Sequence, residues 1–512
     1  MINTLQRKPP RAFRPVAGIG ALALVAASVL TACADMSGIH SSAEMRPAAS
    51  FGLEPGGEVA AAWSHQSWWK DYGDAQLDAV VEQALAGNPS LKMAQIRLDR
   101  AQAVVSAAKA PLLPSAELAG DVSRDKFTAN TLYPPPLGGA TENSAALQAQ
   151  GSWELDFFGK NRAALDASIG AAQAAAADAQ AARLLLASNV VRQYFQLARE
   201  EAQLGVAKRT LTQREQMLAL VHSRLNAGLD TQLELRQSQG GIPEARLQIE
   251  TVLEQQALTR NALAALAGDP GLAARLKAPG LPAAGAVPVP AAVPADLLGR
   301  RADIVAARWR VEAATQDTAS ARAKFYPNIN LTAYAGWSSF GFSNLFKSSS
   351  EQWGFSPAFS LPLFEGGRLR ANLRAKTADL DGAIESYNAA VLDAVHEVAD
   401  QLALSQSVAR QQDEQAQALR VAESSYEIAR QRYQAGLSTQ LQVLAAESTV
   451  LTQRRAEVDL KARALDTQVA LWRVLGGGFQ AQPLSSADEG SGAFAKAALR
   501  AQSALAGSSS QP

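Results

Sequence analysis

The sequence has few of the residues on which most catalytic and metal sites depend. Its 512 residues include one cysteine and four histidines, and no two histidines stand three or four positions apart. A single cysteine excludes an intrachain disulfide. No HExxH, CxxC, GxSxG or Walker motif occurs. We therefore expect no enzyme activity, no catalytic residue, no metal site and no cofactor.

Net charge and long apolar runs are also missing. The 48 basic and 48 acidic residues cancel, so charge gives no reason to expect a nucleic-acid partner. Beyond the N-terminal region, the only long uncharged apolar run is 278–295, and its five prolines exclude a helix. We expect no transmembrane helix in the mature chain, so any crossing of a membrane must use strands.

The N-terminus has the pattern of an export signal. Four basic residues lie between positions 7 and 14, and the 15 residues from Val16 to Leu30 are apolar. The tetrapeptide that ends at Cys33, Leu-Thr-Ala-Cys, resembles the lipobox of bacterial lipoproteins, in which the cysteine carries the lipid. Residue 34 is alanine and not the aspartate that retains such proteins in the inner membrane. This favours an outer-membrane lipoprotein anchored at Cys33.

A duplication dominates the rest of the chain. RLNAGLDTQL at 224–233 returns as RYQAGLSTQL at 432–441, 208 residues later. A period of this length indicates duplication of a whole domain and not a solenoid. Each copy has the pattern of a helix, two extended segments, a very long helix, a turn and a returning helix.

These patterns predict the domain organisation. It comprises a lipoprotein signal peptide (1–32), a flexible lipidated tether (33–60), a first repeat (61–270), a Pro/Ala-rich connector (271–295), a second repeat (296–480) and a disordered tail (481–512). Strands are expected at about 115–128, 143–157, 328–340 and 351–364. Helical hairpins are expected at about 160–266 with a tip at 226–233, and at about 368–475 with a tip at 434–441.

The long helices have coiled-coil spacing near each turn. Apolar residues recur at steps of three and four around Leu218 and Val221, and again around Tyr426 and Tyr433. A glycine ends each long helix, and Thr231 with Glu234, like Thr439 with Gln442, predicts a capping box for the returning helix. The repeated turn is either an efficient helical turn and nothing more, or a docking surface present in both copies.

The extended segments alternate apolar and polar residues. Leu147, Ala149, Gly151 and Trp153, for example, alternate with Gln148, Gln150 and Ser152. A soluble sandwich would show the same period, but the export signal favours strands that span a membrane. Four strands cannot close a pore, and an open sheet edge in lipid leaves backbone groups unpaired. Several chains would therefore share one sheet.

Motifs in a fixed order along the chain resemble one known family. They are Trp68-Trp-Lys-Asp-Tyr-Gly-Asp-Ala-Gln-Leu77, Asn88-Pro-Ser-Leu91, Trp153-Glu-Leu-Asp-Phe-Phe-Gly159, Arg301-Ala-Asp-Ile304, Tyr433-x-Ala-Gly436 and Leu475-Gly-Gly-Gly-Phe479. With the lipobox, they resemble the outer membrane efflux proteins, the TolC-like channels, in the lipoprotein branch that serves resistance-nodulation-division transporters.

The resemblance implies a mainly helical fold with a transmembrane β-barrel. Four strands from each subunit would form a 12-stranded barrel in a homotrimer, above a long periplasmic α-helical barrel. The hairpin tips would meet a periplasmic adaptor protein that joins the channel to the inner-membrane transporter. The tip residues are Gly228, Leu229, Thr231, Gly436, Leu437 and Thr439.

Two positions depart from the family pattern. Ala445 stands where this branch often has an inward aspartate, so the resemblance implies an apolar periplasmic constriction at Leu441 and Ala445. The residues 240–243, Gly-Gly-Ile-Pro, interrupt the first returning helix and predict a kink or a short break.

The expected function is a passive exit duct for small toxic compounds across the periplasm and the outer membrane. The alternatives are a type I secretion duct for polypeptides and a structural lipoprotein that spans the periplasm. The sequence leaves open the cargo, the adaptor and pump, and the resting state of the channel.

Overall fold

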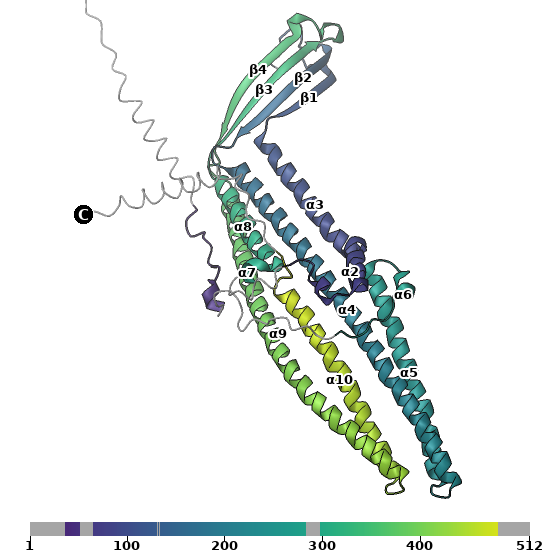
Figure 1. Cartoon of the computed structure of the whole chain (residues 1–512). Helices are drawn as coiled ribbons and strands as arrows, with labels where there is room; N and C mark the ends of the chain where they lie inside the picture. Colours follow the sequence, from purple (N-terminus) through teal and green to yellow (C-terminus); the bar gives the residue numbers. More distant parts are fainter. Residues whose placement is uncertain (1–35, 52–64, 131, 133, 283–296, 480–512) are drawn as a thin grey trace, which may run out of the picture. The chain divides into compact units, whose positions relative to one another are not determined.

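A computed structural model describes residues 36–51, 65–130, 132, 134–282 and 297–479 (Figure 1). The expected signal peptide, Cys33 and the expected C-terminal tail lie outside these residues. The chain divides into two compact units, each of which draws on both copies of the repeat. The first unit is formed by 1–46, 94–176 and 306–390, and the second by 47–93, 177–305 and 391–512. Sequence repeats and spatial units are therefore different divisions of this chain.

Helices make up most of the described chain, as the predicted fold class requires. They are α2 (Ala75–Gly87), α3 (Pro89–Lys109), α4 (Lys160–Asn226), α5 (Gln232–Ala267), α6 (Leu272–Arg275), α7 (Leu297–Arg300), α8 (Ala302–Ala323), α9 (Arg368–Gln434) and α10 (Gln440–Val474). The two long helices, α4 and α9, have 67 residues each. Among the described residues, no helix combines the length and apolar composition needed to cross a bilayer.

One antiparallel sheet belongs to the first unit. Its strands are β1 (Ser115–Lys126), β2 (Thr141–Leu155), β3 (Asn328–Phe340) and β4 (Glu351–Ser360), paired in sequence order. The strands β1 and β2 come from the first copy of the repeat, and β3 and β4 come from the second. The central pair β2 and β3 therefore joins the two copies, with Gly151 opposite Ala333.

The register separates apolar from polar side chains. Leu118 faces Ala149, which faces Ala335, which in turn faces Trp353, so one face of all four strands is apolar. The other face has rows such as Glu117–Gln150–Tyr334 and Ser152–Thr332–Ser356. On the apolar face Leu118 is 73% exposed and Trp353 is 81% exposed. No second sheet of the described chain covers this face, as a soluble sandwich would require.

The core of the second unit is built around paired aromatic rings. Trp68, which is fully buried, stacks on Trp472 with ring centroids 5.8 Å apart. Nearby, the hydroxyl of Tyr194 donates to Asp74 at 2.7 Å. The same aspartate caps α2, because its carboxylate accepts from the backbone of Gln76 and Leu77.

The Gly-Gly-Ile-Pro segment does not break the returning helix. Helix α5 continues from Gln232 to Ala267 with Pro243 inside it, so a short break is absent, and a kink stays a prediction. Arg214 of α4 reaches this turn and donates to the carbonyl of Gly241 at 2.8 Å and to Glu244 at 2.7 Å. A Cβ at Gly241 would lie 3.3 Å from the Arg214 side chain. The glycine therefore leaves room for an arginine that stabilises the weakened turn.

Part of the expected tether has a defined path. Residues 37–46 form hydrogen bonds with α9, for example from the backbone of Arg46 to Asn388 at 3.0 Å. The sequence of this segment has no periodic pattern, so nothing in it indicated the packing. The expected connector begins with the short helix α6, and its residues 283–295 lie outside the described chain.

Close helix packing at Gly170 gives a test of the first unit. A Cβ at this position would lie 3.1 Å from the backbone nitrogen and Cβ of Ala313 on α8. We expect Gly170→Val to lower stability by about 1–3 kcal/mol through overpacking, measured as a lower thermal unfolding midpoint in detergent. On the same helix, a Cβ added at Gly205 would meet no atom within 4 Å. Gly205→Ala should keep or raise the midpoint, because alanine stabilises a helix by up to about 1 kcal/mol relative to glycine. An unchanged midpoint for Gly170→Val would contradict the packing.

Candidate functional site

The two hairpin turns have the same backbone geometry. Gly228 and Gly436 take the left-handed conformation, with φ of 71° and 77°. In the first turn the backbone N–H of Leu229 donates to the carbonyl of Arg224 at 2.9 Å, and in the second that of Leu437 donates to Arg432 at 2.8 Å. This bond closes the last helical turn and needs a residue that accepts positive φ, which explains both glycines.

Large apolar side chains are exposed at equivalent positions of both tips. Leu229 and Leu437 are 65% and 69% exposed, and Leu233 and Leu441 are 62% and 69% exposed. Ala445 is also exposed, one helical turn beyond Leu441 on α10. The two residues expected at a constriction therefore lie on one exposed stripe beside the second tip.

The caps of the two returning helices differ. At the first tip, the hydroxyl of Thr231 accepts from the backbone of Leu233 at 3.1 Å, and the carboxylate of Glu234 accepts from the backbone of Thr231 at 2.9 Å. Hydrogen bonds from the Thr231 side chain and backbone hold the pKa of Glu234 below its usual range. This is the predicted capping box.

The predicted capping box at the second tip is wrong. Thr439 occupies the N-cap, but its side chain makes no capping bond. The backbone N–H of Gln442 bonds instead to the carbonyl of Thr439 at 3.2 Å. That main-chain bond already satisfies the donor that the threonine hydroxyl would cap.

A buried polar cluster joins the two tips within the second unit. The guanidinium of Arg224 donates to Asp230 at 3.1 Å and to the carbonyl of Tyr433 at 2.8 Å. It also lies 4.4 Å from the centre of the Tyr433 ring, as a cation–π contact. The hydroxyl of Tyr433 donates to the same oxygen of Asp230. Each partner is at most 10% exposed at its side chain or ring, so the charges are shielded from water.

The cluster keeps a defined protonation state. Burial, followed by the bond to Asp230, raises the pKa of the Tyr433 hydroxyl, which therefore remains a neutral donor. The hydrogen bond to Asp230 raises the pKa of Arg224, which therefore remains charged. A tyrosine, an arginine and an aspartate with these roles hold the two hairpins together and carry out no chemistry.

The sequence pointed to the tips but missed this cluster. With the 208-residue offset, Asp230 corresponds to Ser438, and Tyr433 corresponds to Leu225. The contact therefore depends on the few positions at which the two turns differ. That difference between the copies was the available signal, because the identical residues mark the turns and not the contact between them.

Apolar packing continues below the polar cluster. All four helices contribute, through Met217 and Val221 of α4, Leu235 of α5, Ala422, Tyr426 and Tyr433 of α9, and Val443 and Val450 of α10. The heptad positions expected for a coiled coil thus face across both hairpins. The side-chain amide of Gln440 donates to the hydroxyl of Ser238 at 2.5 Å, and this buried hydrogen bond joins α10 to α5.

The arrangement is suited to binding and to holding helices together. In the part of the chain that the structure describes, no three His, Cys, Asp or Glu side chains are placed to hold a metal ion. What the tips present is a pair of equivalent exposed leucine surfaces joined by a shielded ion pair.

The tip cluster predicts an asymmetric response to mutation. Asp230→Ala should leave the buried Arg224 without its carboxylate, at a cost of about 1–3 kcal/mol. We expect the amides of 226–233 and 434–441 to exchange with deuterium roughly tenfold faster or more, measured by mass spectrometry. The matched change in the second turn, Ser438→Ala, removes only a long bond to the carbonyl of Ala429. It should leave exchange unchanged, and equal rates in the two variants would contradict the role of Asp230.

Comparison with known proteins gives the same family in both repeats. The family model described as "Outer membrane efflux protein" matches residues 80–269 and again 293–477. The two matched stretches correspond to the two copies of the duplication.

Individual proteins match over most of the chain. The fusaric acid resistance protein FusA of Burkholderia cepacia is 39% identical over 377 residues, which cover 70% of each protein. The multidrug resistance outer membrane protein MdtP of Escherichia coli K12 is 32% identical over 83% of this chain and 89% of its own length. The crystal structure of the outer membrane protein VceC of Vibrio cholerae superposes with a TM-score of 0.76 at 36% identity, over 82% of this chain and 100% of that one.

The family model covers both helical hairpins and all four strands. The chain belongs to the outer membrane efflux protein family.

Proposed function

We propose that the chain is the outer-membrane channel of a tripartite efflux system, a passive exit duct and not an enzyme. The observation that carries this proposal is the sheet, whose apolar face stays exposed while its opposite face is polar. An apolar face towards lipid and a polar face towards a water-filled lumen is the pattern of strands in outer-membrane channels. Family membership supports the same function.

The functional unit is a homotrimer. Within the described chain, β1 and β4 each pair on one side only, so the sheet has two open edges. Open edges are not stable in lipid, because their N–H and C=O groups have no partners. Three copies that pair β4 of one with β1 of the next would close twelve strands into one barrel, with the helices extending into the periplasm.

The hairpin tips are the docking surface for a periplasmic adaptor protein. Each tip presents one exposed leucine after its glycine, Leu229 or Leu437, and three subunits would supply six such tips. Apolar anchors at equivalent positions suit a partner that repeats around the same axis. The adaptor connects the duct to a resistance-nodulation-division transporter, which supplies the energy.

The cargo class is small toxic organic compounds. The relatives in the comparison bear the names of fusaric acid resistance and multidrug resistance proteins. Acylation of Cys33 anchors the mature chain to the outer membrane.

Deletion of the gene in the source bacterium tests this function. We expect lower minimal inhibitory concentrations for several small toxic compounds and stronger dye retention, both restored by a plasmid copy. A plasmid copy that carries Leu118→Arg should not restore them. An arginine on the apolar face costs about 2–4 kcal/mol in the middle of a bilayer. An unchanged profile in a strain without similar channels would contradict efflux and favour polypeptide export or a structural lipoprotein.

The exposed leucine beside the second tip gives a test of the constriction. If Leu441 and Ala445 narrow the periplasmic end, Leu441→Ala should raise single-channel conductance in planar bilayers, because smaller side chains widen the opening. Leu437→Ala is the matched control, since Leu437 is equally exposed but lies in the turn. Unchanged conductance for Leu441→Ala would remove this residue from the constriction.

A further inference from the structure

The segment that follows the expected lipid site begins with a turn at residues 36–39 and then lies along α9. Arg370 donates to the carbonyl of Ser37 at 3.3 Å, Asp381 accepts from Ser41 and Ser42, and Asn388 binds the backbone further on. These three α9 residues stand 11 and 7 positions apart, which places them on one face after three and two helical turns. Residues 370 to 388 span about 27 Å of helix. Their partners follow in the same order along the segment, from Ser37 through Ser41 to Arg46, so the segment and the helix run in the same direction.

Asp381 is the central contact of this segment. Its carboxylate accepts from the hydroxyl of Ser41 at 2.6 Å, and from the hydroxyl and the backbone of Ser42 at 2.9 and 3.2 Å. The backbone of Ala43 adds a longer bond at 3.4 Å. These bonds, led by that from Ser41, hold the pKa of Asp381 below its usual range. A carboxylate with this many donors from one short peptide fixes the position of that peptide.

The two sides of Asp381 are secured differently. Towards the C-terminal end of the segment, the buried Asn388 accepts from the backbone of Arg46 at 3.0 Å and donates to the carbonyl of Glu44 at 3.1 Å. Towards the N-terminal end, Ile39 is buried in an apolar cluster with Ala321, Phe325 and Leu373, and Met36 packs against the same cluster. Apolar and polar contacts thus hold the whole stretch 36–46 against α8 and α9.

The docked segment begins at the end of α9 that follows the sheet. Helix α9 starts at Arg368, eight residues after β4 ends at Ser360. Cys33 precedes Met36 by three residues and therefore lies within about 10 Å of it. If the segment were free as far as Arg46, the 13 steps along the chain from Cys33 would allow a reach of about 45 Å.

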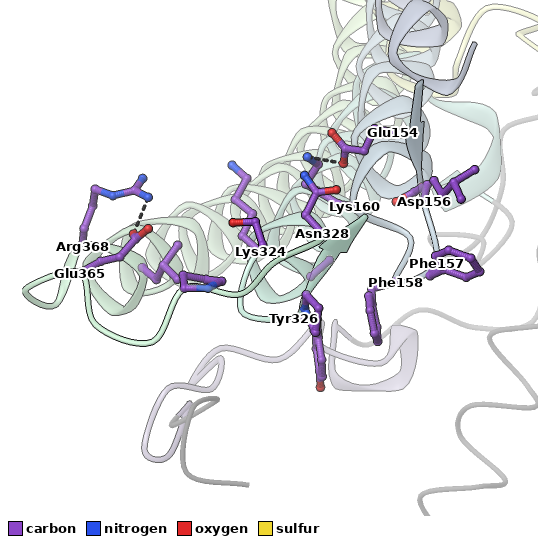
Figure 2. Close-up of a pocket in the computed structure, with 16 residues that line it drawn as sticks. Glu154, Asp156, Phe157, Phe158, Lys160, Lys324, Tyr326, Asn328, Glu365 and Arg368 are labelled. Atoms are coloured by element: carbon purple, nitrogen blue, oxygen red, sulfur yellow. Dashed lines mark ion pairs between the residues drawn. The ribbon is translucent and has the colours of Figure 1, made fainter. Parts of the chain in front are cut away.

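Aromatic rings and cationic side chains lie at this end of the sheet, where Glu154 and Glu365 form ion pairs with Lys160 and Arg368. Figure 2 shows the hollow where the strands meet the helices, with Phe157, Phe158, Tyr326, Lys324 and Arg368 among the residues that line it. Phe158 stacks on Tyr326 with ring centroids 4.9 Å apart, and Phe157 is 68% exposed. Aromatic rings together with lysine and arginine are enriched at the level of the lipid headgroups.

We propose that residues 36–46 form a strap that holds the acylated Cys33 beside the aromatic end of the sheet, so that the lipid anchor and the strands enter the same patch of membrane. The inference rests on the proposed acylation and on the proposed membrane role of the sheet. The anchor makes insertion an intramolecular step, and the strap keeps the effective concentration of the sheet at the membrane high. Effective concentration falls roughly as the −3/2 power of tether length, so release of the strap should slow insertion by up to about tenfold.

Insertion kinetics of the full acylated chain test the strap. Acylated Cys33 does not react with maleimides, so Leu118→Cys on the apolar face can carry a single polarity-sensitive dye. Protein in detergent is diluted into vesicles of phosphatidylethanolamine and phosphatidylglycerol, and the dye reports entry into the apolar phase. The strap variant is Asp381→Ala with Asn388→Ala. The control is Asp379→Ala, which changes an exposed carboxylate on α9 that pairs only weakly, at 3.5 Å, with Lys376.

We expect the strap variant to insert several-fold more slowly than the wild type and the control, and to reach the same final signal. A second variant leaves the packed residues intact and inserts ten Gly/Ser residues between Asp35 and Met36. Its insertion should also be several-fold slower than that of the wild type. This variant tests the strap independently if the double variant does not fold. Equal rates for the spacer variant and the wild type, with acylated Cys33 confirmed by mass spectrometry, would overturn the strap. An unacylated Cys33 would overturn the proposed anchoring as well, and so separates the two failures.

Discussion

The two edge strands of the sheet, β1 and β4, pair with only one neighbour each within the described chain, and one face of the sheet is apolar and exposed. Neither condition is stable in water for an isolated subunit, because edge backbone groups and large apolar side chains both invite association. In the proposed trimer, pairing with other copies would satisfy the edges, and lipid would cover the face. The long helices α4 and α9 follow β2 and β4, so both helical hairpins begin at the same end of the sheet. A membrane channel satisfies both the unpaired strand edges and the exposed apolar face.

The duplication gives the chain two equivalent helical hairpins, and residues that differ between the copies form the contacts that join them. Residues shared by both copies, such as Gly228 and Gly436, shape the two turns, whereas Asp230 and Tyr433 occur in one copy each and hold the tips together. Arg214 and Gly241 are likewise confined to the first copy, where they support the helix around Pro243. In the proposed assembly the equivalent tips would form a ring of docking surfaces. The contacts of Arg224 and Asp230 with Tyr433 join the two hairpins of one chain.

Much of the fold could be predicted from local pattern. Period-two alternation in the segment around Leu147 identified a strand, and the proline-free stretches before Gly228 and Gly436 identified the long helices, because these signals depend on neighbouring residues. The fold class and the family are confirmed. The capping box at Thr439 was wrong, because a main-chain bond already satisfies the N–H of Gln442. A short break at Pro243 is absent, and the distant Arg214 donates to the carbonyl of Gly241 in that turn.

Contacts between distant residues were the main omission. The bonds from Ser41 and Ser42 to Asp381 join positions about 340 apart, and the Tyr433–Asp230 bond joins positions 203 apart. Neither the serines nor the aspartate stands in a periodic or motif context. Single-sequence reasoning finds such groups only when a duplication offers an internal comparison, as it did at the tips.

Site-directed spin labelling along β1 and β4 measures the central claim most directly. Nitroxides placed one at a time from 116 to 122 and from 352 to 359, in the protein reconstituted in bilayers, report collisions with oxygen and with a water-soluble nickel complex. The account predicts alternation with a period of two: oxygen access at Leu118, Trp353 and Phe355, and nickel access at Glu117 and Ser356. Equal access to the nickel complex at both sets of positions would contradict it.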